Sequence, residues 1–391
     1  MATIKQFLTA TAISLSMSLL AISISEAQAS FTFTKIADTK DGFTTFGSNP
    51  TINNDGTVVF SANLDSTSSS ILIGDGKTTS TITDTNGIFS LFGNQPAIND
   101  AGTIAFDANI DTIGSGIFTA SKGITTTIAE SSQPRGAFGS PVINNKGAVA
   151  FLSQSENGRG IFINIDGSTT TVVDTNGAYS DFDGYAINNA NTIAFSARLD
   201  TGERGIFTIT SDGVTIPIAD TTRKFSFVFP PAINNLGTVA FKGVLKEGGE
   251  GIFIVNNGTI TTIAEATAET TTAENTIPDN SKDFKFFENP AINDVGTVAF
   301  KGVLKDGGLG IFTGADPVAD KVIVAGDTLF GSTVKAIYFS NKGLNNSNQI
   351  VFYAILADGT GGIFRADPEP KVPSTEIPSC DCKTKHENLT P

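Results

Sequence analysis

The stretch Pro96-Ala-Ile-Asn-Asp-Ala-Gly-Thr-Ile-Ala-Phe106 decides the fold, because variants of it recur along the whole chain. The pattern P-x-I-N-x-x-G-x-x-x-F occurs in seven copies, two of which, around Asn188 and Asn345, lack the proline. The copies end in the phenylalanines Phe60, Phe106, Phe151, Phe195, Phe241, Phe300 and Phe352, which are 46, 45, 44, 46, 59 and 52 residues apart. A period near 45 residues is typical of one four-stranded blade of a β-propeller.

Each copy belongs to a unit with four short apolar segments, which in the second unit span residues 96–99, 103–109, 116–119 and 125–130. Their alternation and their β-branched residues predict strands. Between the first two segments, one position is always Gly or Asn: Gly56, Gly102, Gly147, Asn191, Gly237, Gly296 and Asn348. These residue types enter the left-handed backbone conformation at least cost, which predicts a tight hairpin turn in every unit.

The two ends of the repeat array complement each other. The seventh unit stops after its third segment, Gly362 to Arg365, and the missing fourth segment resembles residues 33–39. An N-terminal strand that completes the last blade would close the array into a ring. We therefore predict an all-β, seven-bladed β-propeller of four-stranded blades over residues 30–367. An open repeat array is the alternative.

Phenylalanine is expected to dominate the core, since the chain has 30 Phe and no Trp. The repeat phenylalanines and Ile-Phe pairs such as Ile117-Phe118 should pack inside the blades. Phenylalanines that precede the units, among them Phe284 and Phe286, should wedge between neighbouring blades.

Both termini fall outside the repeat. Residues 1–29 read as a secretory signal peptide with Lys5, an apolar stretch and an Ala27-Gln28-Ala29 cleavage site, so we expect a secreted protein. No other segment is long and apolar enough to span a bilayer. The proline-rich residues 368–391 are expected to form a disordered tail. That tail carries Cys380, Cys382 and His386, which we read as part of a frayed end rather than a metal site.

Composition excludes several functions. With 39 acidic against 25 basic residues, the net charge is −14, which argues against nucleic acid as a partner. One histidine in the chain leaves no His-based triad and no multi-histidine metal site.

The phrase Asn-x-x-Gly-x-x-Ala-Phe, found at 99–106, 144–151, 234–241 and 293–300, resembles the tandem NxxGxxAF repeats of bacterial secreted proteins. Many of those relatives carry choice-of-anchor or PEP-CTERM sorting segments. Here Pro368-Glu369-Pro370 resembles the start of such a segment, but no apolar helix follows it. The resemblance covers about residues 31–367 and implies a repeat protein without implying an activity.

One acidic residue ends the fourth segment of each unit: Asp38, Asp84, Glu130, Asp174, Asp220, Glu265 and Asp327. A propeller arranges them in a ring, where carboxylates could attract Ca²⁺. The alternative is structural, with each acid closing a turn and protecting an outer strand from edge pairing. The recurrent Asn at the end of P-x-I-N could form a ring that reads a ligand, but we expect it to bond its own backbone at a tight turn.

No pair of acids stands out as catalytic, and the units stay alike along the chain. We therefore expect a monomeric, non-catalytic extracellular binding or matrix module without a cofactor, unless Ca²⁺ binds the acidic ring. Its ligand would be an extracellular polysaccharide or a surface protein. A carboxylate-based glycan hydrolase or lyase is the alternative, and a calcium-dependent adhesion module is a third reading.

Overall fold

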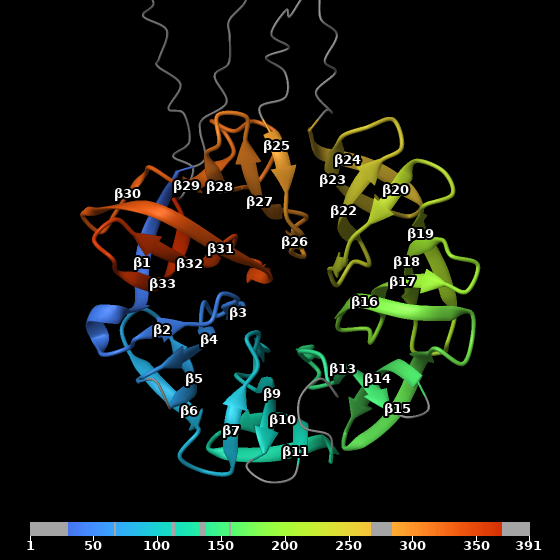
Figure 1. The fold of residues 1–391 in the computed structure, drawn as a ribbon, viewed down its shortest axis with the longest axis horizontal. Helices are drawn as coiled ribbons and strands as arrows, with labels where there is room; N and C mark the ends of the chain where they lie inside the picture. The colour runs from blue at the N-terminus through green and yellow to red at the C-terminus, as the bar shows by residue number, and fades with distance from the viewer. Residues whose placement is uncertain are drawn as a thin grey trace, which may run out of the picture.

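The computed structural model describes residues 30–65, 68–110, 114–132, 138–155, 158–266 and 284–369. The predicted signal peptide, the proline-rich tail and most of the long insertion after Ala266 lie outside this part of the chain. The described residues form a closed ring of seven sheets around a central axis, as Figure 1 shows. The predicted all-β, seven-bladed propeller is therefore confirmed.

The first four blades follow the chain in order. Blade 1 contains β2 (Thr45–Phe46), β3 (Thr51–Ile52), β4 (Val58–Asn63), β5 (Ser69–Gly74) and β6 (Thr79–Asp84). Blade 2 contains β7 (Phe89–Phe92), β8 (Ala97–Ile98), β9 (Ile104–Ile110), β10 (Gly114–Ser121) and β11 (Ile124–Ser131). Blade 3 contains β12 (Val142–Ile143), β13 (Val149–Ser155), β14 (Gly158–Ile165) and β15 (Ser168–Asp174). Blade 4 contains β16 (Tyr179–Ile187), β17 (Ile193–Leu199), β18 (Arg204–Ile209) and β19 (Thr215–Asp220).

The remaining blades complete the ring. Blade 5 contains β20 (Phe225–Val228), β21 (Ala232–Ile233), β22 (Val239–Leu245), β23 (Glu250–Asn256) and β24 (Thr259–Ala266). Blade 6 contains β25 (Phe284–Phe287), β26 (Ala291–Ile292), β27 (Val298–Leu304), β28 (Leu309–Phe312) and β29 (Lys321–Val324). Blade 7 contains β30 (Thr328–Leu329), β31 (Ser332–Leu344), β32 (Ile350–Leu356), β33 (Gly361–Pro368) and the N-terminal β1 (Phe31–Asp38).

The N-terminal strand closes the ring as predicted. Strand β1 pairs antiparallel with β33, with Thr34 opposite Arg365, and it is the outermost strand of blade 7. In Figure 1 the blue β1 lies beside the red β33, so the two ends of the described chain meet in one sheet. A short 3-10 helix, η1 (Thr39–Asp41), follows β1 and leads the chain into blade 1.

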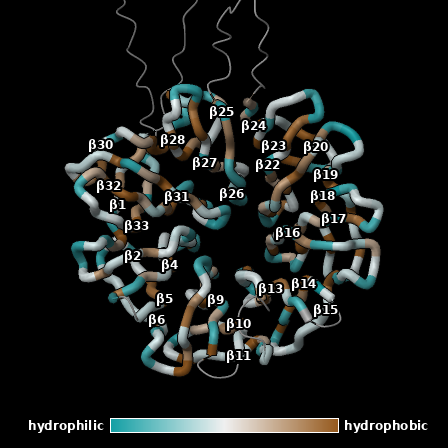
Figure 2. The backbone as a smooth tube through the Cα atoms, viewed as in Figure 1, coloured by the Kyte–Doolittle hydropathy of each residue, from teal (hydrophilic) through white to brown (hydrophobic). Residues whose placement is uncertain are grey.

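The core lies inside the blades and between neighbouring blades. In blade 5, Phe225 contacts Phe241 and Phe253 with ring centroids 5.3 and 5.1 Å apart, and all three rings are buried. Figure 2 shows hydrophobic residues concentrated within the blades and hydrophilic residues in many of the outer loops. One of the expected wedges is an exception, because Phe286 is 43% exposed while Phe287 takes the buried place.

The recurrent turn has the expected backbone conformation. Gly102 has a φ of 76°, and the two asparagines at equivalent positions, Asn191 and Asn348, have φ values of 60° and 58°. The sequence pattern Gly or Asn is thus explained by a left-handed residue in each hairpin. No helix among the described residues is long and apolar enough to cross a membrane.

Candidate functional site

The recurrent asparagines form a closed ring at one mouth of the central channel. They are Asn53, Asn99, Asn144, Asn188, Asn234, Asn293 and Asn345, and all are buried. Each side-chain oxygen accepts a hydrogen bond from the backbone N–H four residues later, at 2.9–3.0 Å. Each side-chain nitrogen donates to the backbone carbonyl of the equivalent Asn in the next blade, at 2.8–3.4 Å. The expected bond to the asparagine's own backbone is confirmed, and the bond between blades is an addition to it.

A second ring lies beside the first. It consists of the residues that follow those asparagines: Asn54, Asp100, Asn145, Asn189, Asn235, Asp294 and Asn346. Each backbone N–H donates to the side-chain oxygen of the next member, at 2.7–3.0 Å. The second ring and all of the first except Asn99 and Asn188 line a polar cavity of about 170 Å³. The side-chain oxygens at this mouth already accept hydrogen bonds from backbone N–H groups. The bonds between neighbouring members of each ring connect the blades, so we assign this mouth a structural role.

The other mouth of the channel holds a larger cavity of about 560 Å³. The seven segments that lead to the ring asparagines run the same way along the channel. Residues that precede these asparagines in sequence therefore lie toward this mouth. The position four residues before each ring asparagine lines the cavity, and its members are Asn49, Gln95, Ser140, Gly184, Pro230, Asn289 and Asn341. One position thus supplies seven wall residues of several chemical types. The units were expected to stay alike, but they differ here, because this position precedes the P-x-I-N pattern and its residue type varies from copy to copy.

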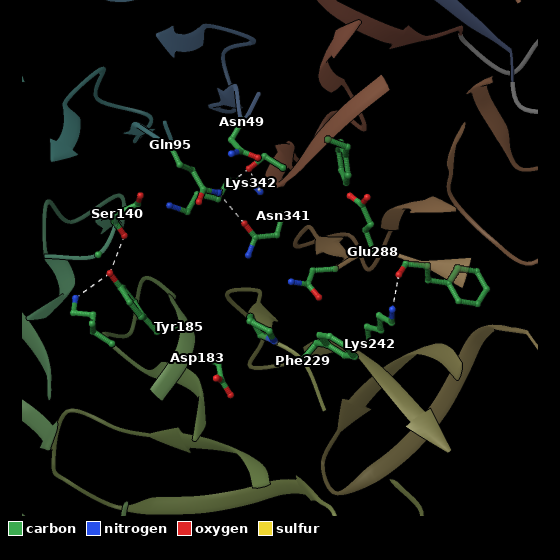
Figure 3. A pocket seen from close by; sticks show the side chains of 18 of the residues that line it. Asn49, Gln95, Ser140, Asp183, Tyr185, Phe229, Lys242, Glu288, Asn341 and Lys342 are labelled. Atoms are coloured by element: carbon green, nitrogen blue, oxygen red, sulfur yellow. Dashed lines mark hydrogen bonds between the residues drawn. The ribbon is translucent and has the colours of Figure 1, made fainter. Parts of the chain in front are cut away.

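Two residues depart from the proline that begins five of the seven copies. Tyr185 and Lys342 take its place in blades 4 and 7, and both line the cavity. The Tyr185 hydroxyl donates to the Ser140 carbonyl at 2.8 Å and accepts from the Leu152 N–H at 3.0 Å. Burial raises the pKa of Tyr185 far above its usual value, so the phenol stays protonated. Figure 3 shows Tyr185 directed at Ser140 in the cavity wall.

Lys342 reaches across the channel. Its Nζ donates to the Pro141 carbonyl at 2.9 Å, which joins blade 7 to blade 3. Burial lowers the pKa of Lys342 to about 7, and the negative charge of Asp107 acts in the opposite direction. A second bridge runs from Gln95 Nε2 in blade 2 to Ser340 and Asn341 in blade 7, at 3.0 and 3.2 Å (Figure 3). Polar side chains therefore span the channel at this level.

Two buried polar atoms near this wall have no hydrogen-bond partner among the described residues. They are Asp107 Oδ1 and Arg159 Nε. Burial raises the pKa of the Asp107 carboxyl, although Ser140 and the charge of Lys342 lower it. The Arg159 guanidinium lines the cavity and forms an ion pair with Asp181 through another nitrogen.

The opposite side of the cavity carries aromatic rings and one lysine, Lys242, that already has partners. Lys242 Nζ donates to the Phe287 carbonyl at 2.7 Å and pairs with Glu250 at 3.1 Å. The same ammonium lies 4.5 and 3.7 Å from the ring centroids of Phe229 and Phe286. Burial lowers the pKa of Lys242, against the raising effect of Glu250. The rings of Phe229 and Phe286 both line this side of the cavity.

The acidic residues predicted from sequence lie elsewhere. Six of them occur in or at the ends of the outermost strands β1, β6, β11, β15, β19 and β24, and Asp327 lies between β29 and β30. Four carboxylates, those of Asp38, Asp84, Asp174 and Asp220, accept a hydrogen bond from the backbone N–H two residues later, at 2.8–3.0 Å. The predicted turn-closing role is confirmed for these four. Among the described residues, no group of three or more His, Cys, Asp or Glu is placed to hold a metal ion.

The sequence of this chain matches one family over most of its length. The chain belongs to DUF7453, a family of unknown function whose sequence model matches residues 35–373. Comparison with curated proteins finds no match.

Solved structures share the fold of this DUF7453 protein at low sequence identity. An oligogalacturonate lyase from Vibrio parahaemolyticus is 11% identical with a TM-score of 0.55, and the match covers 87% of this chain and 98% of the lyase. A prolyl endopeptidase is 11% identical with a TM-score of 0.53, and the match covers 84% of this chain and 50% of that one. At this identity, the likeness shows the propeller fold alone.

Proposed function

We propose that this protein is a secreted, non-catalytic binding module for an extracellular polysaccharide and that it holds sugar units in the 560 Å³ cavity. The observation that carries this proposal is the wall to which all seven blades contribute, one residue each, at a position where the repeat allows variation. Cavities of a few hundred Å³ with convergent polar groups are the usual form of small-ligand sites.

The chemistry of the wall suits a sugar. Hydroxyl groups both donate and accept hydrogen bonds, and the amides of Gln95, Asn289 and Asn341 do the same. Asn289 forms no hydrogen bond with another described residue and is therefore available to a ligand. The apolar face of a sugar ring can pack on the exposed part of Phe286.

The carboxylates that line the cavity favour binding over hydrolysis. Asp183 pairs with Arg204, and Glu288 pairs with Lys301. Glycoside hydrolysis by two carboxylates needs one of them as a proton donor to the leaving group. Both acids here are ion-pair partners, a role that positions them for hydrogen bonds to hydroxyls.

A lyase is the second candidate, and Lys342 favours it. An amine whose pKa is lowered to about 7 is partly unprotonated near neutral pH and can remove a proton next to a carboxylate. The protonated Tyr185 hydroxyl in the same wall already donates its proton to the Ser140 carbonyl, so binding without turnover remains the proposal.

Titration calorimetry with a panel of neutral and acidic oligosaccharides tests the proposal. The Asn289→Ala protein should bind its best oligosaccharide at least about tenfold more weakly, since it loses one or two hydrogen bonds to the ligand. The Asn86→Ala protein, changed in an exposed turn between β6 and β7, should bind like the unchanged protein. Failure of every oligosaccharide to bind would overturn the proposal, and so would the appearance of cleaved products.

Export is part of this proposal. It rests on the signal-like residues 1–29, which lie outside the described part of the chain. N-terminal sequencing of the protein recovered from the culture medium should begin near Ser30. Protein retained in the cell with residue 1 intact would contradict export.

A further inference from the structure

One wall of the cavity has two cationic side chains, Arg159 and Lys342, whose N–H donors are only partly used by other described residues. We propose that the sugar it binds carries a carboxylate, as a uronic acid does, and that Arg159 and Lys342 bind this carboxylate. This inference rests on the proposed function and adds the class of ligand to it.

Arg159 provides the first unused donor. Its side chain lines the cavity and is 35% exposed, and one guanidinium nitrogen pairs with Asp181. Its Nε is buried and has no partner among the described residues. Because that atom has almost no accessible surface, a ligand would bind the exposed end of the guanidinium, where only the nitrogen paired with Asp181 is hydrogen-bonded to another described residue. The planar guanidinium also matches the geometry of a carboxylate.

Lys342 provides the second. An ammonium has three N–H donors, and among the described residues that of Lys342 uses one, to the Pro141 carbonyl at 2.9 Å. Asp107 acts on it through charge, and no hydrogen bond joins the two. A ligand carboxylate would supply the missing acceptors and would favour the charged form of the amine.

Both cations lie against the same piece of wall. Lys342 contacts Pro141, and the hydroxyl of Tyr185 contacts the neighbouring Ser140. Arg159 is close enough to Tyr185 for its charge to lower the pKa of the phenol. Lys342 is likewise close enough to Asp107 for its charge to lower the pKa of that carboxyl. Lys342 therefore contacts the segment Ser140–Pro141, and Arg159 lies close to the same segment. This region of the cavity wall is rich in N–H donors.

The remaining charged residues of the lining do not compete for this role. Lys242 already uses two of its three N–H donors, on Glu250 and the Phe287 carbonyl, and Glu250 balances its charge. The acids Asp183 and Glu288 are paired with Arg204 and Lys301. Since the whole chain has a net charge of −14, selectivity for an acidic sugar must come from these two local cations and not from long-range attraction.

The test compares galacturonate and glucuronate oligosaccharides with neutral galactose and glucose oligosaccharides of the same length and linkage, by titration calorimetry on the full chain. The unchanged protein should bind a uronate at least about tenfold more tightly than its neutral counterpart. The Arg159→Gln and Lys342→Met proteins should each lose at least about fivefold of uronate affinity and keep their neutral-sugar affinity. Lys146→Met, at an exposed lysine near the other mouth, is the matched control and should change nothing.

Methyl-esterified uronate oligosaccharides provide a test that needs no variant, should Arg159→Gln fail to fold. The ester removes the charge and keeps the ring, so binding to the unchanged protein should fall to the level of the neutral sugar. Equal affinity for acid, ester and neutral sugar would overturn this inference and leave the proposed function standing. Unchanged uronate affinity in folded Arg159→Gln and Lys342→Met proteins would also overturn it. Absence of binding to any sugar would overturn the proposed function itself.

Discussion

The side-chain nitrogen of Asn345 donates a hydrogen bond to the backbone carbonyl of Asn53 across 3.0 Å. This bond joins blade 7 to blade 1, so that the Asn ring has no free end. The β1–β33 pairing closes the same junction at the outer edge of the propeller. The ring is thus fastened twice between its last and first blades, once near the axis and once at the rim.

Removal of one ring asparagine should lower stability measurably. In Asn345→Ala the Asn53 carbonyl loses a buried hydrogen bond, and the N–H groups of Ser347 and Gln349 lose part-buried ones. We expect a loss of about 1–3 kcal/mol in the free energy of unfolding. Urea unfolding followed by circular dichroism measures it, with Asn86→Ala as the control. Equal midpoints for the two variants would show that the ring contributes little.

Removal of the closing strand should have a larger effect. A protein that starts after Asp38 loses the β1–β33 ladder and the buried Ile36 and Ala37, and it exposes the edge of β33. We expect a clear fall in melting temperature and a tendency to associate through that edge. A synthetic peptide of residues 30–41 should restore the melting temperature in a concentration-dependent way, because it binds the folded state only. A truncated protein that melts like the intact one would contradict closure by β1.

The recurrent turn makes a prediction about residue type. Gly102 has a φ of 76° with open space around its missing Cβ, so backbone strain alone decides what is tolerated. Gly102→Asn should be nearly neutral, as Asn191 and Asn348 already occupy equivalent places. Gly102→Val should cost about 1–2 kcal/mol or more, because a β-branched residue strongly disfavours positive φ. Gly87→Val, in an equally open turn without positive φ, is the control. Similar urea midpoints for Gly102→Asn and Gly102→Val would contradict this account.

Uronate affinity should depend on pH near neutrality. Burial lowers the pKa of Lys342 to about 7, so its positive charge disappears as the pH rises through that value. An ionised Asp107 carboxylate would also repel a uronate, while the buried Tyr185 stays neutral. Affinity should therefore fall up to about tenfold between about pH 6 and pH 8.

The Lys342→Met protein separates this effect from other titrations. Its uronate affinity should be low and nearly independent of pH, and Asp107→Asn should keep most of the dependence. Calorimetry at a series of pH values measures both. Rising product formation above pH 7 would instead indicate Lys342 as the base of a lyase, since a general base must be unprotonated.

Much of the architecture was open to prediction because every unit repeats it. The spacing of the phenylalanines gave the blade length, and the split unit at the two ends gave ring closure. The cavity was harder to predict. Gln95 and Ser340, or Lys342 and Pro141, are far apart in sequence and belong to different blades, so only the curvature of the ring brings them into contact. One signal was present in the sequence, namely the replacement of the repeat proline by Tyr185 and Lys342.

The sequence by itself determined the strands, the left-handed turns and the number of blades, because these follow from local backbone preferences and from repetition. Only the tertiary structure decided which mouth of the channel carries the candidate site. At one mouth, the recurrent asparagines bond to one another from blade to blade and hold the adjoining turns with their side-chain oxygens. At the other, unlike residues from seven blades meet around one axis and leave Arg159 and Lys342 with donors to spare.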